Sequence, residues 1–285
     1  MTVEPTRGIL TAAKSPYWHL LRTQINSVCG EGFSIAVVDH GLTDFQRQEI
    51  ARRGGQVVDV PDPVLWDHSI ADNREGQTIV PYRSWLKPWV CQHSPFDQTV
   101  WVDADAITIR NVGRLFDLVA DGDFLTLESW TSDQYTLMMY NDLLQRLADT
   151  HDLPSRHANA SLINAGVLGF SGRPMWIDQW WELSVKLLSD PSLRKLCETC
   201  DQCALVATLC TMDMAVPTPR IMRDRGLNWP ANGLPSQTNK RRKQYPWGQP
   251  DILNRLRDDH PDATVVHWLG TEKPWFEDAA SKSNQ

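Results

Sequence analysis

The chain has 285 residues, of which 41% are hydrophobic and 22% are charged, a composition typical of a globular protein with a sizeable core. Its formal net charge of −7 argues against nucleic acid as the main partner. No apolar run approaches the ~20 residues that cross a bilayer, and the N-terminal residues do not have the layout of a signal peptide. We therefore expect a cytoplasmic protein with no transmembrane segment, whose six cysteines are reduced.

The first sixty residues alternate between strand and helix patterns. Thr43 is a typical N-cap residue, and Ser15 followed by Pro16 is a typical helix start, so we expect a side-chain cap at both positions. Because strands that alternate with helices form parallel sheets, the pattern predicts a doubly wound α/β fold. The expected elements are a strand over Gly8–Ala12, a helix from Ser15, a strand over Ser34–Asp39, a helix over Asp44–Arg53 and a strand over Gln56–Val60.

Two carboxylates follow a short apolar run at Val100–Val102. Asp103 and Asp105 are two residues apart, so in extended chain both side chains point to the same side. They lie at the end of a strand, where ligands of α/β sheets collect. Carboxylate ligands suit Mg²⁺ or Mn²⁺. The competing interpretation is that one aspartate makes a turn and the other caps the next element.

The remaining sequence continues the alternation. Neither Gly-x-Gly-x-x-Gly nor Gly-x-x-x-x-Gly-Lys-Ser/Thr occurs, which disfavours a nicotinamide-dependent dehydrogenase and a P-loop enzyme. Asn164-Ala165-Gly166 interrupts an apolar run and predicts either a ligand close to the backbone or a β-bulge. The expected elements are helices over Tyr82–Trp89, Asp142–Asp149, Pro174–Leu188 and Pro191–Cys210, strands over Asp123–Glu128, Ser161–Phe170 and Thr264–His267, and a long surface excursion over Pro217–Gln249.

Four motifs now stand in order: Asp103-Ala104-Asp105, Asn164-Ala165-Gly166, Asp201-Gln202 and His267-x-x-Gly270-x-x-Lys273-Pro274-Trp275. Together they resemble the retaining glycosyltransferases of family 8, which have the GT-A fold, and the agreement spans nearly the whole chain. The resemblance implies a single GT-A domain over residues 1–285, with a mostly parallel central sheet flanked by helices. Residues 1–110 would form its nucleotide-binding half and residues 111–285 its acceptor-side half, with the excursion at 217–249.

The resemblance also implies ligands: a nucleotide-sugar donor, usually a UDP-sugar, with Mn²⁺ or Mg²⁺ at its diphosphate, and a carbohydrate, polyol or other hydroxyl acceptor. The resemblance implies that the metal ligands are Asp103, Asp105 and His267, and that the donor is contacted by Ala104, Gly270, Lys273 and Lys87. It further implies that the nucleoside end of the pocket is formed by Thr11, Ala12 and Tyr17. Asn164 would contact a sugar, and Asp201 and Gln202 would act at the reacting carbon. The chemistry of the residues agrees, because a metal and a lysine can neutralise leaving phosphates. One imidazole beside two carboxylates also favours Mn²⁺ over Mg²⁺. Without the motif, His267 would be read as a packed core histidine.

Several alternatives stay open. A carbohydrate- or nucleotide-sugar-binding protein could keep this fold without turnover, and a sugar nucleotidyltransferase has a related sheet, although its usual Gly-rich, Arg-containing loop is absent from Thr11–Pro16. That loop also lacks the polar residue often used to read uracil, which leaves the base open. The spacing of Cys197, Cys200 and Cys203, with Cys210 beyond, matches part of an iron–sulfur run and equally a buried stripe on a helix.

Overall fold

The computed structural model describes residues 4–61, 85–127, 142, 144–146, 149, 163–190, 193, 201–212, 216–230 and 251–268. None of the helices within these residues is long and apolar enough to cross a bilayer. In chain order the elements are β1 (Arg7–Ala13), η1 (Ser15–Tyr17), α1 (Trp18–Gly30), β2 (Ser34–Asp39), α2 (Asp44–Arg52), β3 (Gln56–Val58), α4 (Lys87–Gln92), β4 (Gln98–Val102), β5 (Ala106–Thr108), α5 (Val112–Ala120), β6 (Phe124–Leu127), β7 (Ile163–Ser171), α7 (Met175–Ser189), α9 (Asp201–Thr211), β8 (Arg220–Met222), η3 (Arg225–Leu227), β9 (Trp229–Pro230), α10 (Ile252–Asp259) and β10 (Val265–His267).

The predicted alternation over the first sixty residues is confirmed, because β1, β2 and β3 pair in parallel with α1 and α2 between them. Thr43 and Gln46 form a capping box that begins α2. The predicted cap by Ser15 is wrong: Lys14 is the N-cap residue of η1 and makes no side-chain cap. Ser15 Oγ instead accepts a hydrogen bond of 3.1 Å from Gln46 Nε2. The side chain of Gln46 therefore takes part in the capping box of α2 and also binds the first residue of η1.

The main sheet has seven strands in the order β3-β2-β1-β4-β7-β6-β8. Among the described strands of this sheet, β7 is antiparallel to both neighbours and the other pairs are parallel. The expected mostly parallel sheet is therefore confirmed. The pairing of β6 with β7 jumps from Leu168 to Asn164, so the register of the two strands skips Ala165–Val167. This is an irregularity of the β-bulge kind.

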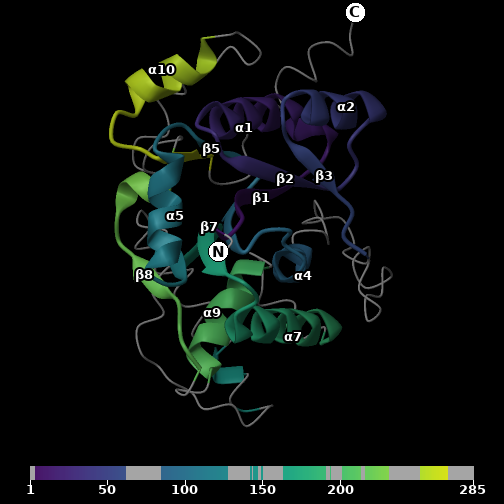
Figure 1. The fold of residues 1–285 in the computed structure, drawn as a ribbon. Coiled ribbons are helices and arrows are strands. Elements are labelled where there is room, and N and C mark those ends of the chain that lie inside the picture. Colours follow the sequence, from purple (N-terminus) through teal and green to yellow (C-terminus); the bar gives the residue numbers. More distant parts are fainter. Residues whose placement is uncertain are drawn as a thin grey trace, which may run out of the picture.

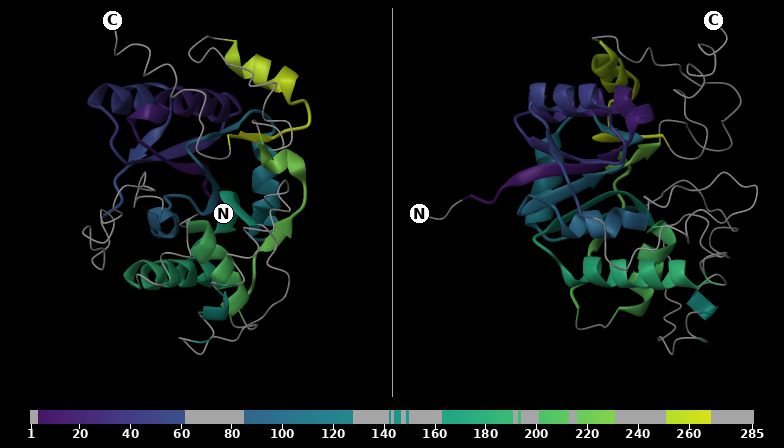
Figure 2. Two further views of the ribbon diagram at one scale, coloured as in Figure 1. Left: turned by 180° about the vertical axis from the view of Figure 1, so that it is seen from behind. Right: turned by 90° about the vertical axis from the view of Figure 1, so that its right-hand side faces the viewer.

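Helices cover both faces of the main sheet (Figure 1). Successive residues of a strand point to opposite faces, and β1 follows this rule. Ile9 packs in a core with residues of α1, α2 and α5, whereas Leu10 packs in a core with residues of α4, α7 and α9. Figure 2 shows the same three layers from behind and from the side. Two apolar cores, one on each face, thus hold the carboxyl ends of β1 and β4 in place.

A second sheet, with the order β5-β10-β9, lies next to the end of β4. β10 runs antiparallel to β5 and places His267 opposite Ala106, while Trp268 N donates a hydrogen bond of 2.9 Å to Asp105 O. This sheet joins two segments that are far apart in the sequence. It brings His267 to the two aspartates.

Several predicted segments differ in extent. The expected surface excursion over Pro217–Gln249 contains β8, which joins the main sheet, and β9, which joins the small one, so the prediction of a surface loop is wrong for that part. Residues 231–249 lie outside the described residues, as do 82–84 and 151–159. Of the expected helix over Pro191–Cys210, residues 191–192 and 194–200 also lie outside them, and α9 begins at Asp201.

Candidate active site

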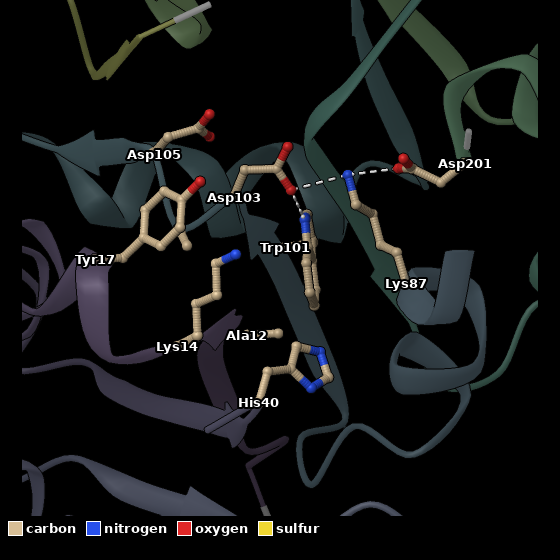
Figure 3. Close-up of a pocket in the computed structure, with 10 residues that line it drawn as sticks. Ala12, Lys14, Tyr17, His40, Lys87, Trp101, Asp103, Asp105 and Asp201 are labelled. Carbon is tan, nitrogen blue, oxygen red and sulfur yellow. Dashed lines mark hydrogen bonds and ion pairs between the residues drawn. The ribbon is translucent and has the colours of Figure 1, made fainter. Parts of the chain in front are cut away.

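A pocket lies at the end of the main sheet where β1 and β4 finish (Figure 3). In the view of Figure 3, Tyr17 lies at one side of the pocket and Asp201 at the other. The pocket therefore extends from residues 1–110, the nucleotide-binding half expected from the sequence, to α9. Its walls are formed by Ala12, Lys14, Tyr17, His40, Lys87, Trp101, Asp103, Ala104, Asp105 and Asp201.

Asp103 and Asp105 leave β4 through a tight turn. Asp103 N donates to Gly166 O at 2.9 Å, and Ala106 N donates to Asp103 O at 3.0 Å. These backbone bonds fix the turn, and both carboxylates line the pocket. The indole of Trp101 donates a hydrogen bond of 2.7 Å to Asp103 Oδ1 and thereby orients that carboxylate.

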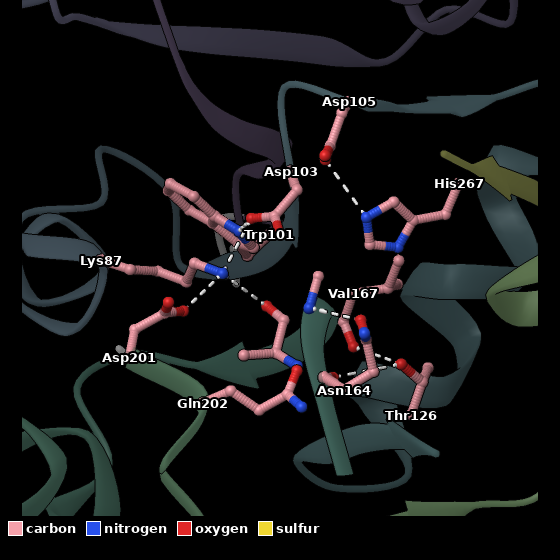
Figure 4. A network of polar contacts seen from close by, with 12 residues as sticks. Lys87, Trp101, Asp103, Asp105, Thr126, Asn164, Val167, Asp201, Gln202 and His267 are labelled. Atoms are coloured by element: carbon pink, nitrogen blue, oxygen red, sulfur yellow. Dashed lines mark hydrogen bonds and ion pairs between the residues drawn. The ribbon is translucent and has the colours of Figure 1, made fainter. Parts of the chain in front are cut away.

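Lys87 is buried between two carboxylates (Figure 4). Its Nζ lies 2.8 Å from Asp103 Oδ1 and 2.7 Å from Asp201 Oδ2, and it donates a hydrogen bond of 3.0 Å to Ala165 O. Burial by itself would lower the pKa of Lys87, but the charges of Asp103 and then Asp201 outweigh burial and raise it. Lys87 is thus a fixed positive charge that links β4, β7 and α9.

Asp201 is the first residue of α9, and its backbone oxygen accepts a hydrogen bond of 2.9 Å from Trp180 Nε1. Burial raises the pKa of its carboxyl group to about 6; Lys87 acts against this rise, and the negative charge of Asp103 adds to it. At neutral pH the carboxyl group is therefore ionised, but it is held in a place where its charge is poorly solvated.

Asp103, Asp105 and His267 each present one ligand atom, and these atoms lie within 4.8 Å of one another. His267 is 4% exposed, and its Nε2 lies 3.1 Å from Asp105 Oδ1. Two carboxylates with one imidazole form a donor set that suits Mn²⁺ and related divalent ions. The residues present therefore fit a divalent metal ion, and no other group of three His, Cys, Asp or Glu side chains in the described part of the chain converges in this way.

No protein-family model and no curated protein matches the chain. Among solved structures, the galactosyltransferase LgtC in complex with donor and acceptor sugar analogues is similar over 96% of this chain and 91% of its own, with a TM-score of 0.58 and 16% identity. An active-site mutant of LgtC gives a TM-score of 0.57 at 16% identity, over 96% of this chain and 95% of its own. The glycosyltransferase GlyE of Streptococcus pneumoniae TIGR4 gives 0.52 at 15% identity, over 95% of this chain and 56% of its own.

The chain has the GT-A fold. This confirms the predicted fold class, and the structural neighbours are glycosyltransferases, as the motifs led us to expect. GlyE and the bifunctional glycosyltransferase WbbM are longer proteins, of which the chain covers 56% and 48%. The match thus concerns about half of each of these two chains.

Most of the predicted site residues gather at the pocket of this GT-A domain. Seven of them form part of its wall: Ala12, Tyr17, Lys87, Asp103, Ala104, Asp105 and Asp201. Thr11 is buried inside β1 and is not part of the wall. Burial, and then the charges of Asp105 and Asp103, raise the pKa of Tyr17 to about 12, so its phenol keeps its proton at neutral pH.

Asn164 and Gln202 are not among the residues that line the pocket. Asn164 is buried, and its Oδ1 accepts a hydrogen bond of 2.8 Å from Gly166 N. Gln202 Oε1 accepts one of 3.4 Å from Ala165 N. The closest approach to Gly166 comes from the ring of His267, because a Cβ at position 166 would lie 2.3 Å from His267 Cε1. Within the described residues, the glycine therefore makes room for a metal-ligand candidate.

Sequence reasoning missed Lys14, His40 and Trp101 as pocket residues. Lys14 and His40 directly follow β1 and β2, so the rule that ligands bind at the carboxyl ends of parallel strands indicates both residues.

Gly270 and Lys273 lie outside the described residues, as do Cys197 and Cys200. Within the described residues, neither Cys203 nor Cys210 forms a disulfide. Cys203 is buried in the apolar core formed with α7, and burial raises the pKa of Cys210. Both cysteines behave as small apolar residues of α9, which agrees with the helix-stripe interpretation.

Proposed function

We propose that this protein is a metal-dependent glycosyltransferase that moves a sugar from a nucleotide-sugar donor, in the first place a UDP-sugar, to a hydroxyl group of an acceptor with retention of anomeric configuration. The observation that carries the proposal is the convergence of Asp103, Asp105 and His267 beside a pocket of a GT-A fold. Neighbours with this fold support it, since LgtC is a galactosyltransferase that was solved with donor and acceptor sugar analogues. Residues 1–110 would bind the nucleotide and residues 111–285 would face the acceptor.

Transfer breaks the bond between the anomeric carbon and the leaving diphosphate, so negative charge grows on the phosphate and positive charge on the sugar. Asp103, Asp105 and His267 would hold Mn²⁺, or Mg²⁺, which when bound stabilises charge on the diphosphate. Lys14 lines the pocket and would add a second cation. By the resemblance, Gly270 and Lys273 of the C-terminal motif would contact the diphosphate.

Tyr17 and Ala12 line the pocket wall formed from β1 and η1, where the nucleoside would bind. Because the phenol of Tyr17 stays protonated, it can donate a hydrogen bond to a phosphate or sugar oxygen. Lys87 lies between Asp103 and Asp201 and would position both. Lys87 would therefore act on the donor through two carboxylates.

Asp201 and Gln202 would lie beside the reacting carbon, with Asn164 supporting the sugar pocket from behind. An ionised Asp201 can stabilise positive charge on the sugar or attack the anomeric carbon, and Gln202 offers an amide oxygen for the same purpose. An active-site mutant of LgtC in which glutamine is replaced by glutamate indicates that a glutamine also belongs to that enzyme's site. Two groups on one face of the sugar are consistent with retention.

Calorimetry tests the metal bridge directly. UDP should bind much more tightly with Mn²⁺ than with EDTA, and UDP-sugar should be hydrolysed slowly without an acceptor. Equal UDP binding in both conditions would contradict the proposal. Tight, metal-dependent binding with no hydrolysis or transfer across a panel of nucleotide sugars and acceptors would instead indicate a binding protein with this fold.

The stereochemical outcome tests the retaining chemistry separately. NMR coupling constants of the first-formed product should show the anomeric configuration of the donor. An inverted product would refute retention and the roles of Asp201 and Gln202, while leaving metal-dependent transfer intact.

A further inference from the structure

Four buried polar side chains form a network that includes the metal-ligand candidate His267. Three of them, Thr126, Asn164 and His267, are labelled in Figure 4. Thr126 belongs to β6, Asn164 to β7 and His267 to β10, and Asn228 lies between η3 and β9. Each is at most 5% exposed. Because unpaired polar groups are costly in such a place, the hydrogen bonds of the network determine how each side chain is oriented.

Two backbone groups fix the direction of every hydrogen bond in this network. Gly166 N–H donates to Asn164 Oδ1 at 2.8 Å, so that atom is an acceptor. Thr126 Oγ1 donates to Val167 O at 2.9 Å, so its single proton is used and it can only accept elsewhere. The side-chain amide of Asn228 faces both of these acceptors.

The orientation of Asn228 follows from its two neighbours. Its Nδ2 lies 3.0 Å from Thr126 Oγ1 and 2.9 Å from Asn164 Oδ1, and both of these atoms need a donor. A flipped amide would place its oxygen against two acceptors. Asn228 Oδ1 is therefore turned to His267 Nδ1, 3.0 Å away, and it can only accept there.

The consequence concerns the tautomer of His267. Since Asn228 Oδ1 cannot donate, Nδ1 must carry the proton, and a neutral ring then has its lone pair on Nε2. That lone pair faces Asp105 Oδ1 at 3.1 Å, an arrangement that favours a cation at the site. Without the acceptor at Nδ1, a neutral ring would place its proton on Nε2, donate it to Asp105 and lose the ability to bind a metal through that atom.

We propose that Asn228 is a positioning residue that selects the Nδ1–H tautomer of His267 and so keeps Nε2 available as a metal ligand. The proposal rests on the proposed metal-dependent function, but the tautomer can be measured without metal or donor. The same network includes Asn164, so one set of hydrogen bonds holds both the imidazole and the bulged segment of β7 that accommodates it.

The experiment uses metal-free protein labelled with ¹⁵N in histidine, studied by long-range ¹H–¹⁵N NMR at pH 8.5. The His267 signal is assigned by its loss in His267→Gln. Wild-type protein should show the Nδ1–H tautomer, and Asn228→Leu should show the Nε2–H tautomer. Mn²⁺ binding without donor, measured by electron paramagnetic resonance, should weaken about 10–100-fold in Asn228→Leu, as is typical when the partner of a metal-binding histidine is lost.

Thr126→Val is the matched control, because it removes two buried hydrogen bonds of the same network and leaves the acceptor at His267 in place. It should keep the Nδ1–H tautomer and bind Mn²⁺ within a few-fold of wild type. A wild-type ring with its proton on Nε2, or on both nitrogens, would overturn the proposal even if Asn228→Leu failed to fold. So would an unchanged tautomer and Mn²⁺ affinity in Asn228→Leu. If wild-type protein has the Nδ1–H tautomer but binds no Mn²⁺, the proposed function fails and the role of Asn228 in the tautomer stands.

Discussion

Replacing Lys87 with methionine removes the ammonium group that lies between Asp103 and Asp201 and keeps a side chain of similar shape. In the wild-type protein, Lys87 Nζ lies 2.8 Å from Asp103 Oδ1 and 2.7 Å from Asp201 Oδ2, and the side chains of these aspartates are 25% and 10% exposed. Without the ammonium group, the two carboxylates would repel each other. Removing one partner of a buried ion pair costs about 3–5 kcal/mol. We expect Lys87→Met to lose a free energy of unfolding in this range at pH 8.

The loss should shrink at low pH, because Asp201 can take up a proton. The pKa of Asp201 in the folded protein is already raised to about 6, although the positive charge of Lys87 lowers it. Removal of Lys87 should therefore raise the pKa of Asp201 further. An acid whose pKa is higher in the folded than in the unfolded state contributes stability below its unfolded pKa and loses it as the pH rises through the folded pKa. At pH 5 the folded variant therefore keeps Asp201 neutral, and the destabilisation should be clearly smaller than at pH 8.

Urea unfolding in EDTA, at pH 5 and pH 8, measures both values. Lys186→Met in α7 is the matched control, since Lys186 is half-buried and does not line the candidate site. The control should stay within about 0.5 kcal/mol of wild type, as is usual for substitutions away from such features. A loss below about 1 kcal/mol for Lys87→Met at pH 8, or an equal loss at both pH values, would refute the view that Lys87 neutralises buried carboxylates.

Three further predictions concern the same site. His267→Ala should weaken Mn²⁺ binding by at least about 10–100-fold, with partial recovery of activity at high Mn²⁺; a lower melting temperature with an unchanged Mn²⁺ titration would assign His267 to the core instead. Gly166→Ala should weaken Mn²⁺ binding as well, since its Cβ would lie 2.3 Å from His267 Cε1 and 2.6 Å from Asn164 Oδ1, whereas Gly30→Ala, with open space around it, should not. Asp201→Asn should become more stable relative to wild type as the pH rises from 4 to 7.5 in EDTA, by roughly 2 kcal/mol for a pKa raised to about 6. Parallel pH profiles from denaturant titrations would contradict the burial of a charged Asp201.

Local patterns were enough to predict the elements that carry the site. The apolar run before Asp103 forms β4, and Thr43 begins α2 through a capping box that side-chain chemistry alone indicates. The strand-end rule then placed both aspartates at a pocket. These predictions succeeded because a strand followed by a polar turn is decided by neighbours in the sequence.

Contacts between distant segments could not be predicted in this way. Lys87 and Ala165 are 78 residues apart, and Asn228 and His267 are 39 apart. No periodicity or spacing indicates that a lysine in a short helix will be enclosed by two carboxylates, or that one asparagine in a Pro- and Asn-rich segment will accept from an imidazole. The prediction that Ser15 caps a helix was wrong for a related reason. Its hydroxyl oxygen accepts a hydrogen bond from Gln46 of α2, so a tertiary contact takes the place of the local cap.

The charges at the inner end of the pocket explain why a divalent ion suits it. The side chains of Asp103, Asp105 and Asp201 have three formal negative charges, and Lys87 supplies one formal positive charge beside two of them. The remaining two negative charges match one divalent cation. Because Lys87 is held by two carboxylates and a backbone oxygen, it is poorly placed to neutralise a diphosphate as well, so that task would fall to the ion and to Lys14 in the described part of the pocket. Lys87 would then influence donor binding through the geometry of Asp103, whereas the resemblance implied a direct contact between Lys87 and the donor.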